Sequence, residues 1–97
     1  MKGYLIGNIN VKNAESYREY AKAAEPIVRA YGGRYLVRGG KAEPLEDTKA
    51  WRLVVLEFPS LADAEKFYRS PEYRKIMHLR TDNAETHLFA LAEGYSS

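Results

Sequence analysis

The order in which two hydrophobic periodicities follow one another along the chain constrains its fold more than any other feature of the sequence. Alternating apolar and polar residues, or runs rich in β-branched and aromatic residues, indicate strands, whereas apolar residues three or four positions apart indicate helices. One helical segment follows the first β-type segment and another follows the third. We expect strands over residues 3–11, 34–38, 51–58 and 86–92, and helices over residues 14–31 and 61–80.

The resulting order, β-α-β-β-α-β, predicts one α+β domain over residues 1–97 with a ferredoxin-like fold. A chain of 97 residues has room for a single hydrophobic core. Right-handed crossovers place both helices on one face of a four-stranded antiparallel sheet and leave the other face bare. A sheet with apolar residues on both faces must cover the second one. Because no third helix is available, we expect a second copy of the chain to cover it, in a two-fold homodimer packed sheet to sheet.

Prolines interrupt both expected helices. Pro26 removes the hydrogen bond to residue 22, so we expect a kink there or a break into two short helices. Ser70 is a preferred helix cap and Pro71 a preferred first helical residue, so the second helix is expected to be bent or split between them. Residues 39–49, rich in Gly, Pro and acidic side chains, predict one long loop.

Composition excludes several kinds of chemistry. The chain has no cysteine, which removes disulfides, zinc–thiolate sites, iron–sulfur clusters and thiol nucleophiles. Its 15 basic and 13 acidic residues give a net charge of +2 and are interleaved, so we expect no binding to nucleic acid. No signal peptide and no apolar run near the ~20 residues of a membrane span are visible. We therefore expect a cytoplasmic protein that is not bound to a membrane.

Two arginines in apolar strands are the strongest candidates for a ligand site. Arg38 ends the second expected strand, and Arg52 lies near the start of the third. A buried guanidinium keeps its charge, so it needs a carboxylate, a carbonyl or an anionic ligand as a partner. Anion binding is one interpretation, and an arginine paired within the protein or across the dimer is the other. Glu57 is an available partner, although alternation places it on the opposite face of its strand from Arg52.

Glu57 is also the candidate for a general base. It lies at the end of a hydrophobic strand, where loss of water would raise the pKa of its carboxyl. A structural carboxylate that accepts hydrogen bonds is the alternative. Tyr4 and Asn8 are expected on the same side of neighbouring strands as Arg52, where the three would line a small pocket for a planar acidic or carbonyl compound. The alternative for Tyr4 is core packing with its hydroxyl at the edge.

The two histidines do not predict a metal site. His78 and His87 are nine residues apart, on an expected helix and near the start of an expected strand, which is not the spacing of a helical metal pair. Serine, aspartate and histidine form no recognisable nucleophile pattern. We expect no cofactor.

Several separate segments together resemble a known family: residues 31–40 (YGGRYLVRGG), 57–60 (EFPS) and 70–73 (SPEY), followed by Arg80. In this order they are similar to domain-of-unknown-function family 1330, small bacterial proteins of the dimeric α+β barrel superfamily. The resemblance spans nearly the whole chain. It implies a ferredoxin-like fold, a homodimer with a barrel-like interface between sheets, and a cavity between sheet and helices in each subunit. It implies no reaction, because the superfamily contains both enzymes and proteins without known activity.

These observations lead to two functional hypotheses. The first is a homodimer that binds a small anionic or carbonyl-bearing metabolite beside its sheet, with Arg38 and Arg52 as anion anchors. If it is an enzyme, cofactor-free proton transfer or oxygenation is the economical mechanism, with Glu57 moving the proton and an arginine stabilising the enolate. The second is a non-catalytic dimeric interaction module.

Overall fold

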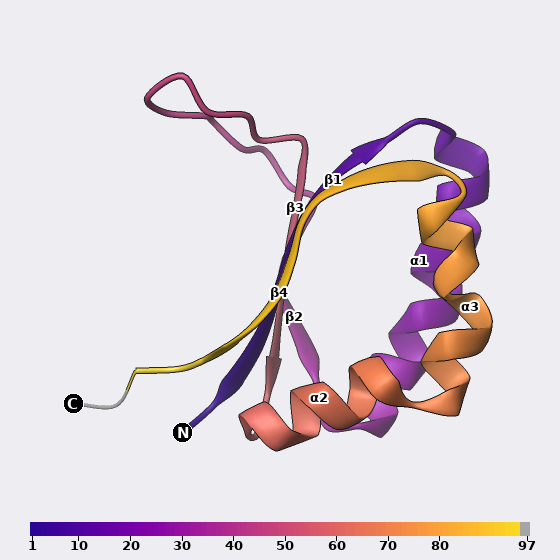
Figure 1. Ribbon diagram of the computed structural model, residues 1–97, viewed down its shortest axis with the longest axis vertical. Helices are drawn as coiled ribbons and strands as arrows, with labels where there is room; N and C mark the ends of the chain where they lie inside the picture. Colours follow the sequence, from indigo (N-terminus) through magenta and orange to yellow (C-terminus); the bar gives the residue numbers. More distant parts are fainter. Residues whose placement is uncertain (96–97) are drawn as a thin grey trace.

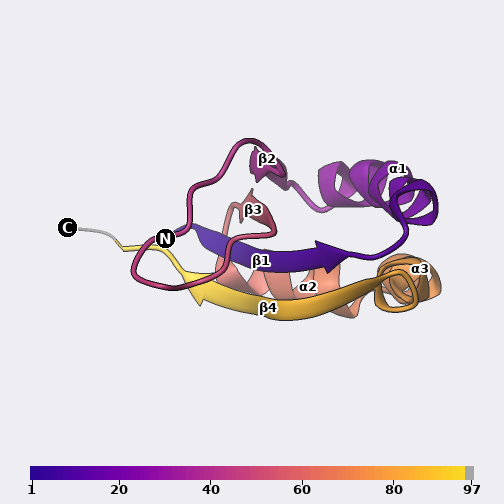
Figure 2. The same ribbon diagram turned by 90° about the horizontal axis from the view of Figure 1, so that it is seen from above.

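A computed structural model, which describes residues 1–95, shows a four-stranded antiparallel sheet with helices on only one of its faces (Figures 1 and 2). The strands lie in the order β2-β3-β1-β4. This is the expected ferredoxin-like arrangement, with the second helix divided in two. The elements are β1 (Gly3–Val11), α1 (Ala14–Ala30), β2 (Arg34–Arg38), β3 (Arg52–Phe58), α2 (Leu61–Arg69), α3 (Pro71–Thr81) and β4 (Ala84–Glu93).

The first helix, α1, is not broken at Pro26. It runs through the proline as one helix of 17 residues, capped at its start by the side chain of Asn13, which accepts a hydrogen bond from the N–H of Ser16. The predicted break is therefore wrong. Ala24 and Val28, on either side of Pro26, are buried, and this packing keeps the helix continuous although proline removes one of its hydrogen bonds.

The second helical segment is split at Ser70, as expected. The buried Ser70 hydroxyl donates to the carbonyl of Phe67 at the end of α2 and accepts from the N–H of Tyr73 in the first turn of α3. One side chain thus ends one helix and begins the next. The division leaves α2 against the sheet and lets α3 pack along α1. None of the helices formed by residues 1–95 is long and apolar enough to cross a membrane.

Alternation along the strands separates a covered face of the sheet from a bare one. In β1, Leu5 and Ile9 face the helices and are almost fully buried, whereas Ile6 and Asn8, which alternate with them, are half-buried on the other face. In β3, Leu56 and Phe58 belong to the same covered face. The core lies between this face and the helices, and its aromatic members come from both sides: Tyr17, Tyr20, Phe58, Phe67 and Tyr73.

An irregularity in β2 places two arginines of one strand on opposite faces. Arg34 pairs with Glu57 in the register of β2 and β3, on the bare face. The register shifts between Tyr35 and Val37, so that one extra residue enters β2. Strict alternation would put Arg38 on the same side as Arg34. The shift instead turns Arg38 to the covered face.

The expected loop between β2 and β3 projects from the sheet on the side away from the helices (Figure 1). Asn8 on β1 holds its end: the Asn8 side chain donates to the carbonyl of Lys49 at 2.9 Å and accepts from the N–H of Trp51 at 3.0 Å. Trp51, which the sequence placed in the third strand, lies one residue before it and stacks on His87 with ring centroids 4.0 Å apart.

Candidate functional site

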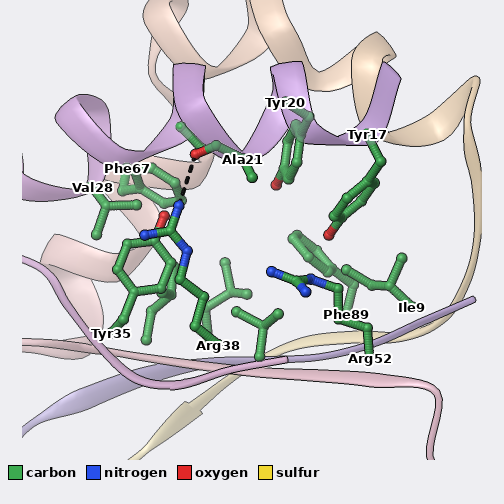
Figure 3. A pocket seen from close by; sticks show the side chains of 14 residues that line it. Ile9, Tyr17, Tyr20, Ala21, Val28, Tyr35, Arg38, Arg52, Phe67 and Phe89 are labelled. Carbon is green, nitrogen blue, oxygen red and sulfur yellow. Dashed lines mark hydrogen bonds between the residues drawn. The ribbon is translucent and has the colours of Figure 1, made fainter. Parts of the chain in front are cut away.

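A cavity and a pocket adjoin each other between the covered face of the sheet and α1. The inner cavity has a volume of ≈ 30 Å³, which is enough for a water molecule and too small for a metabolite. The outer pocket, at the end of the sheet where β1 and β2 finish and β3 begins, has a volume of ≈ 350 Å³. Tyr17, Ala21 and Arg52 line both. In Figure 3 Arg38 and Arg52 extend from the sheet toward α1, and Tyr17 and Tyr20 extend from α1 toward the sheet.

Arg52 is the least compensated group of this site. Its Nε is buried and has no hydrogen-bond partner among residues 1–95. No carboxylate within those residues forms an ion pair with it. Its guanidinium lies 5.5 Å from the centroid of the Tyr17 ring and packs against the backbone of Gly39. Gly39 has a φ of 67°, in the region that favours glycine, and any side chain there would collide with Arg52.

Arg38 lines the inner cavity, as Arg52 does, but its charge is neutralised. Its Nη1 lies 2.6 Å from a carboxylate oxygen of Glu25, and its Nη2 donates to the carbonyl of Ala21 at 3.1 Å. The guanidinium also stacks 4.2 Å from the centroid of the Tyr35 ring. Arg38, followed by Arg29, lowers the pKa of Glu25. Both arginines that were expected to act together line the inner cavity, but only Arg52 has no carboxylate partner among residues 1–95.

Two tyrosines of α1, Tyr17 and Tyr20, line the inner cavity together with Arg52. Burial raises the pKa of Tyr17, and burial raises that of Tyr20 well above 10.0. Both hydroxyls therefore stay protonated at neutral pH and can act as hydrogen-bond donors. The Tyr20 hydroxyl lies 2.7 Å from that of Tyr73 on α3.

Behind the tyrosines lies a second buried arginine that the sequence analysis did not place in the site. Arg80 is only 3% exposed, donates to the hydroxyls of Thr86 at 2.6 Å and Tyr73 at 3.4 Å, and stacks 4.0 Å from the centroid of the Phe89 ring. No carboxylate of residues 1–95 pairs with it. One signal was available: Arg80 follows Tyr73 by seven residues, which places both on one face of a helix.

The remaining candidates lie on the other side of the sheet. Ile9, and not Asn8, pairs with Arg52 in the register of β1 and β3, so Arg52 faces the helices while Tyr4 and Asn8 face away. The expected pocket of Tyr4, Asn8 and Arg52 does not form. As alternation predicted, Glu57 is on the opposite face of β3 from Arg52.

Glu57 also has a different electrostatic environment from the one expected. Its carboxylate lies 2.8 Å from Nε of Arg34 and accepts a hydrogen bond from the Tyr4 hydroxyl at 2.9 Å. Arg34 and then Tyr4 lower its pKa, whereas the sequence-based expectation was a raised one. The compensating charge outweighs the loss of water. Glu57 therefore has the structural environment of an ion pair and faces away from the cavity of Arg52.

The two histidines lie on different elements. His78 is on α3, and His87 lies in the irregular part of β4, where it stacks on Trp51. Among residues 1–95, no three His, Asp or Glu side chains are grouped so that they could hold a metal ion.

Comparisons with known proteins give the chain a family and a fold. The family model described as "Domain of unknown function (DUF1330)" matches residues 2–95. No curated protein matches the chain. Among solved structures, the RPA0582 protein of unknown function from Rhodopseudomonas palustris is 19% identical with a TM-score of 0.76, and the match covers 99% of this chain and 84% of that one. The methylated RPA0582 protein gives the same identity and TM-score, over 98% and 82% of the two chains.

Proposed function

The chain belongs to the family of domain of unknown function DUF1330, and we propose that it binds a small anionic or carbonyl-bearing metabolite in the pocket between its sheet and α1. One observation carries the proposal: Arg52 lies between the inner cavity and the outer pocket with its Nε buried and without a partner within residues 1–95. A ligand oxygen at this point would supply the missing acceptor.

A buried hydrogen-bond donor without an acceptor destabilises the folded protein. Leaving one without a partner costs about 1–3 kcal/mol, and more when the group is charged. Arg80 adds a second positive charge near the same tyrosines, whereas the Glu25 carboxylate offsets the charge of Arg38. The field at the Arg52 end of the cavity is therefore positive and favours a bound anion.

Native mass spectrometry of the protein purified from its own cells tests this proposal. We expect a discrete bound mass in the wild-type protein, the same mass in Arg34→Gln, and its loss in Arg52→Gln. Arg34→Gln is the matched control because it also removes one arginine charge from the sheet, but on the bare face. A wild-type protein without any bound mass, also after incubation with an extract of those cells, would contradict the proposal.

The partner we propose for the bare face is a second copy of the chain. Large apolar side chains are exposed along it, with Leu36, Val37 and Leu88 each more than 40% exposed in the single chain. The four strands offer a strip on the order of 500 Å². A stable complex buries about 800 Å² per partner, so the loop that projects from the same side would supply the remainder. Leu45, 65% exposed in that loop, is the apolar residue placed to do so.

Sedimentation velocity tests the dimer. We expect a two-copy species for the wild type and a single chain for Val55→Lys, because Val55 lies in the middle of β3 on the bare face. Ala30→Lys, at the exposed end of α1, is the control and should remain a dimer. Circular dichroism checks that each variant is folded. A single-chain wild type at micromolar concentration would contradict the proposal, and a dimer without bound mass would favour a non-catalytic interaction module.

A further inference from the structure

Resting on the proposed function, we infer that the ligand is a small monocarboxylate with an apolar body, and that its carboxylate binds Arg52. The same pocket is poorly suited to a phosphorylated metabolite. Three features of the pocket carry this inference: the number of free charges, the supply of hydrogen-bond donors, and the character of the walls.

The free charge in the pocket corresponds to one negative charge on the ligand. Arg38 is paired with Glu25, and Arg80 lines neither the cavity nor the pocket, because its guanidinium donates to the hydroxyls of Tyr73 and Thr86. Arg18, which lines the outer pocket, is exposed, where water screens its charge. Arg52 is thus the one lining guanidinium of residues 1–95 that is both partly buried and free of a carboxylate. A phosphate group carries about −1.5 to −2 charges at neutral pH, which this site does not balance.

The donors of the pocket also fit two oxygens better than three. A guanidinium presents a planar fork of N–H groups that matches a carboxylate. Phosphate sites add backbone N–H groups from glycine-rich loops. Gly39 is the glycine at the rim of this pocket, but its N–H already donates to the carbonyl of Leu53 at 2.8 Å. The remaining wall segments belong to α1 and to strands.

The walls beside Arg52 are apolar and small. On α1, Ala14, Tyr17 and Ala21 are spaced by three and four residues and form one stripe toward the outer pocket. Val11 at the end of β1 lies on the same pocket. Side chains this small leave the ≈ 350 Å³ of space, which is near the lower end of ligand pockets, at about 300 Å³. A hydrophobic body would pack there against the Tyr17 ring while its carboxylate reaches Arg52.

Isothermal titration calorimetry with four probes separates the parts of the inference. Benzoate has both the carboxylate and the apolar ring, acetate lacks the ring, benzamide lacks the charge, and phenyl phosphate carries the larger charge on the same ring. We expect benzoate to bind at least tenfold more tightly than each of the other three. We expect Arg52→Gln to abolish benzoate binding and Arg52→Lys, which keeps the charge without the fork, to weaken it about tenfold.

A second pair of variants tests where the ring lies. Ala14→Leu should weaken benzoate binding because it fills the outer pocket, and Ala30→Leu, at the other end of α1, should leave it unchanged. Benzoate binding that is equal in wild type and Arg52→Gln would overturn the inference. Tighter binding of phenyl phosphate that is lost in Arg52→Gln would overturn it and leave the proposed function standing. If none of the probes binds although the native protein carries an Arg52-dependent mass, the carboxylate assignment fails alone.

Discussion

On the bare face of the sheet Arg34 pairs with Glu57, whereas on the covered face Arg52 and Arg80 have no carboxylate partner among residues 1–95. Glu57 and Arg52 lie on the two faces of the same strand, β3, whereas Arg34 is on β2 and Arg80 reaches the covered side from α3. An exposed ion pair contributes little, because water already screens both charges. A buried charge without a partner is expensive. The arginine charge on the bare face is neutralised, whereas that of Arg52 is left open beside a cavity, as the proposed anion site requires.

The largest expected difference between the two faces concerns packing. Leu56→Ala on the covered face should lower the free energy of unfolding by about 2–5 kcal/mol, because Leu56 is 4% exposed and leaves a cavity. Leu53→Ala on the bare face of the same strand should cost about 1 kcal/mol or less in the single chain. Urea unfolding at several protein concentrations measures both. If the bare face is the dimer interface, only the loss in Leu53→Ala grows with concentration, and equal, concentration-independent losses would erase the distinction.

A smaller difference in stability is expected between variants that lose one of two tyrosine hydroxyls. Tyr73→Phe removes a hydroxyl that lies between that of Tyr20 and Nε of Arg80, so it should cost about 1–3 kcal/mol. Tyr4→Phe removes a hydrogen bond to Glu57 on the bare face and should cost less than Tyr73→Phe. Thermal unfolding of the two variants ranks them. A costlier Tyr4→Phe would mean that the bare-face cluster, and not the buried arginine, depends more on its hydroxyl.

Replacing Arg52 and replacing Arg34 should change the free energy of unfolding in opposite directions. Arg52→Met removes a buried donor without a partner, so we expect it to raise the free energy of unfolding of the ligand-free protein by about 1–2 kcal/mol. Arg34→Met removes an ion pair whose arginine is exposed to water, and it should lower that energy slightly. Urea unfolding of both proteins after removal of small molecules checks the signs. A destabilised Arg52→Met would make Arg52 a structural residue.

The smallest effect concerns pH. Because Arg34 and Tyr4 lower the pKa of Glu57 below its ordinary value of 4.5, its ionised form stabilises the folded state above that pH. This stabilisation is lost as the pH falls from 4.5 through the lower pKa of the folded state. Glu57→Gln should therefore lose less stability than the wild type between neutral pH and the acid range, in urea titrations at successive pH values. Parallel curves for the two proteins would mean that the pair does not hold in solution.

Much of the fold could be predicted from the sequence, because local chemistry determines where strands and helices form. Alternation located β1 residue by residue, and the Ser70 hydroxyl explains why a serine before proline divides a helix. Alternation within one strand also placed Arg52 and Glu57 on opposite faces. The break expected at Pro26 does not occur, because packing of the residues around it overrides its local preference.

The site was harder to predict because it depends on register between strands. Pairing Arg52 with Ile9 separates it from Tyr4 and Asn8, and no pattern within β1 or β3 alone contains that information. Arg38 reaches the cavity only because β2 carries an extra residue. The spacing of α3 placed Arg80 on the same helix face as Tyr73. It did not show that Arg80 is buried against Thr86 and Phe89, because these residues come from another element.

The contact between Gly39 and Arg52 ties two positions that are thirteen residues apart in the chain. A side chain at position 39 would displace the guanidinium from its place beside the pocket, and the left-handed backbone there favours glycine as well. The two residues should therefore be inherited together. A related protein in which glycine 39 has been replaced should also have lost the arginine, so the aligned sequences of relatives contain a record of which of them keep this pocket.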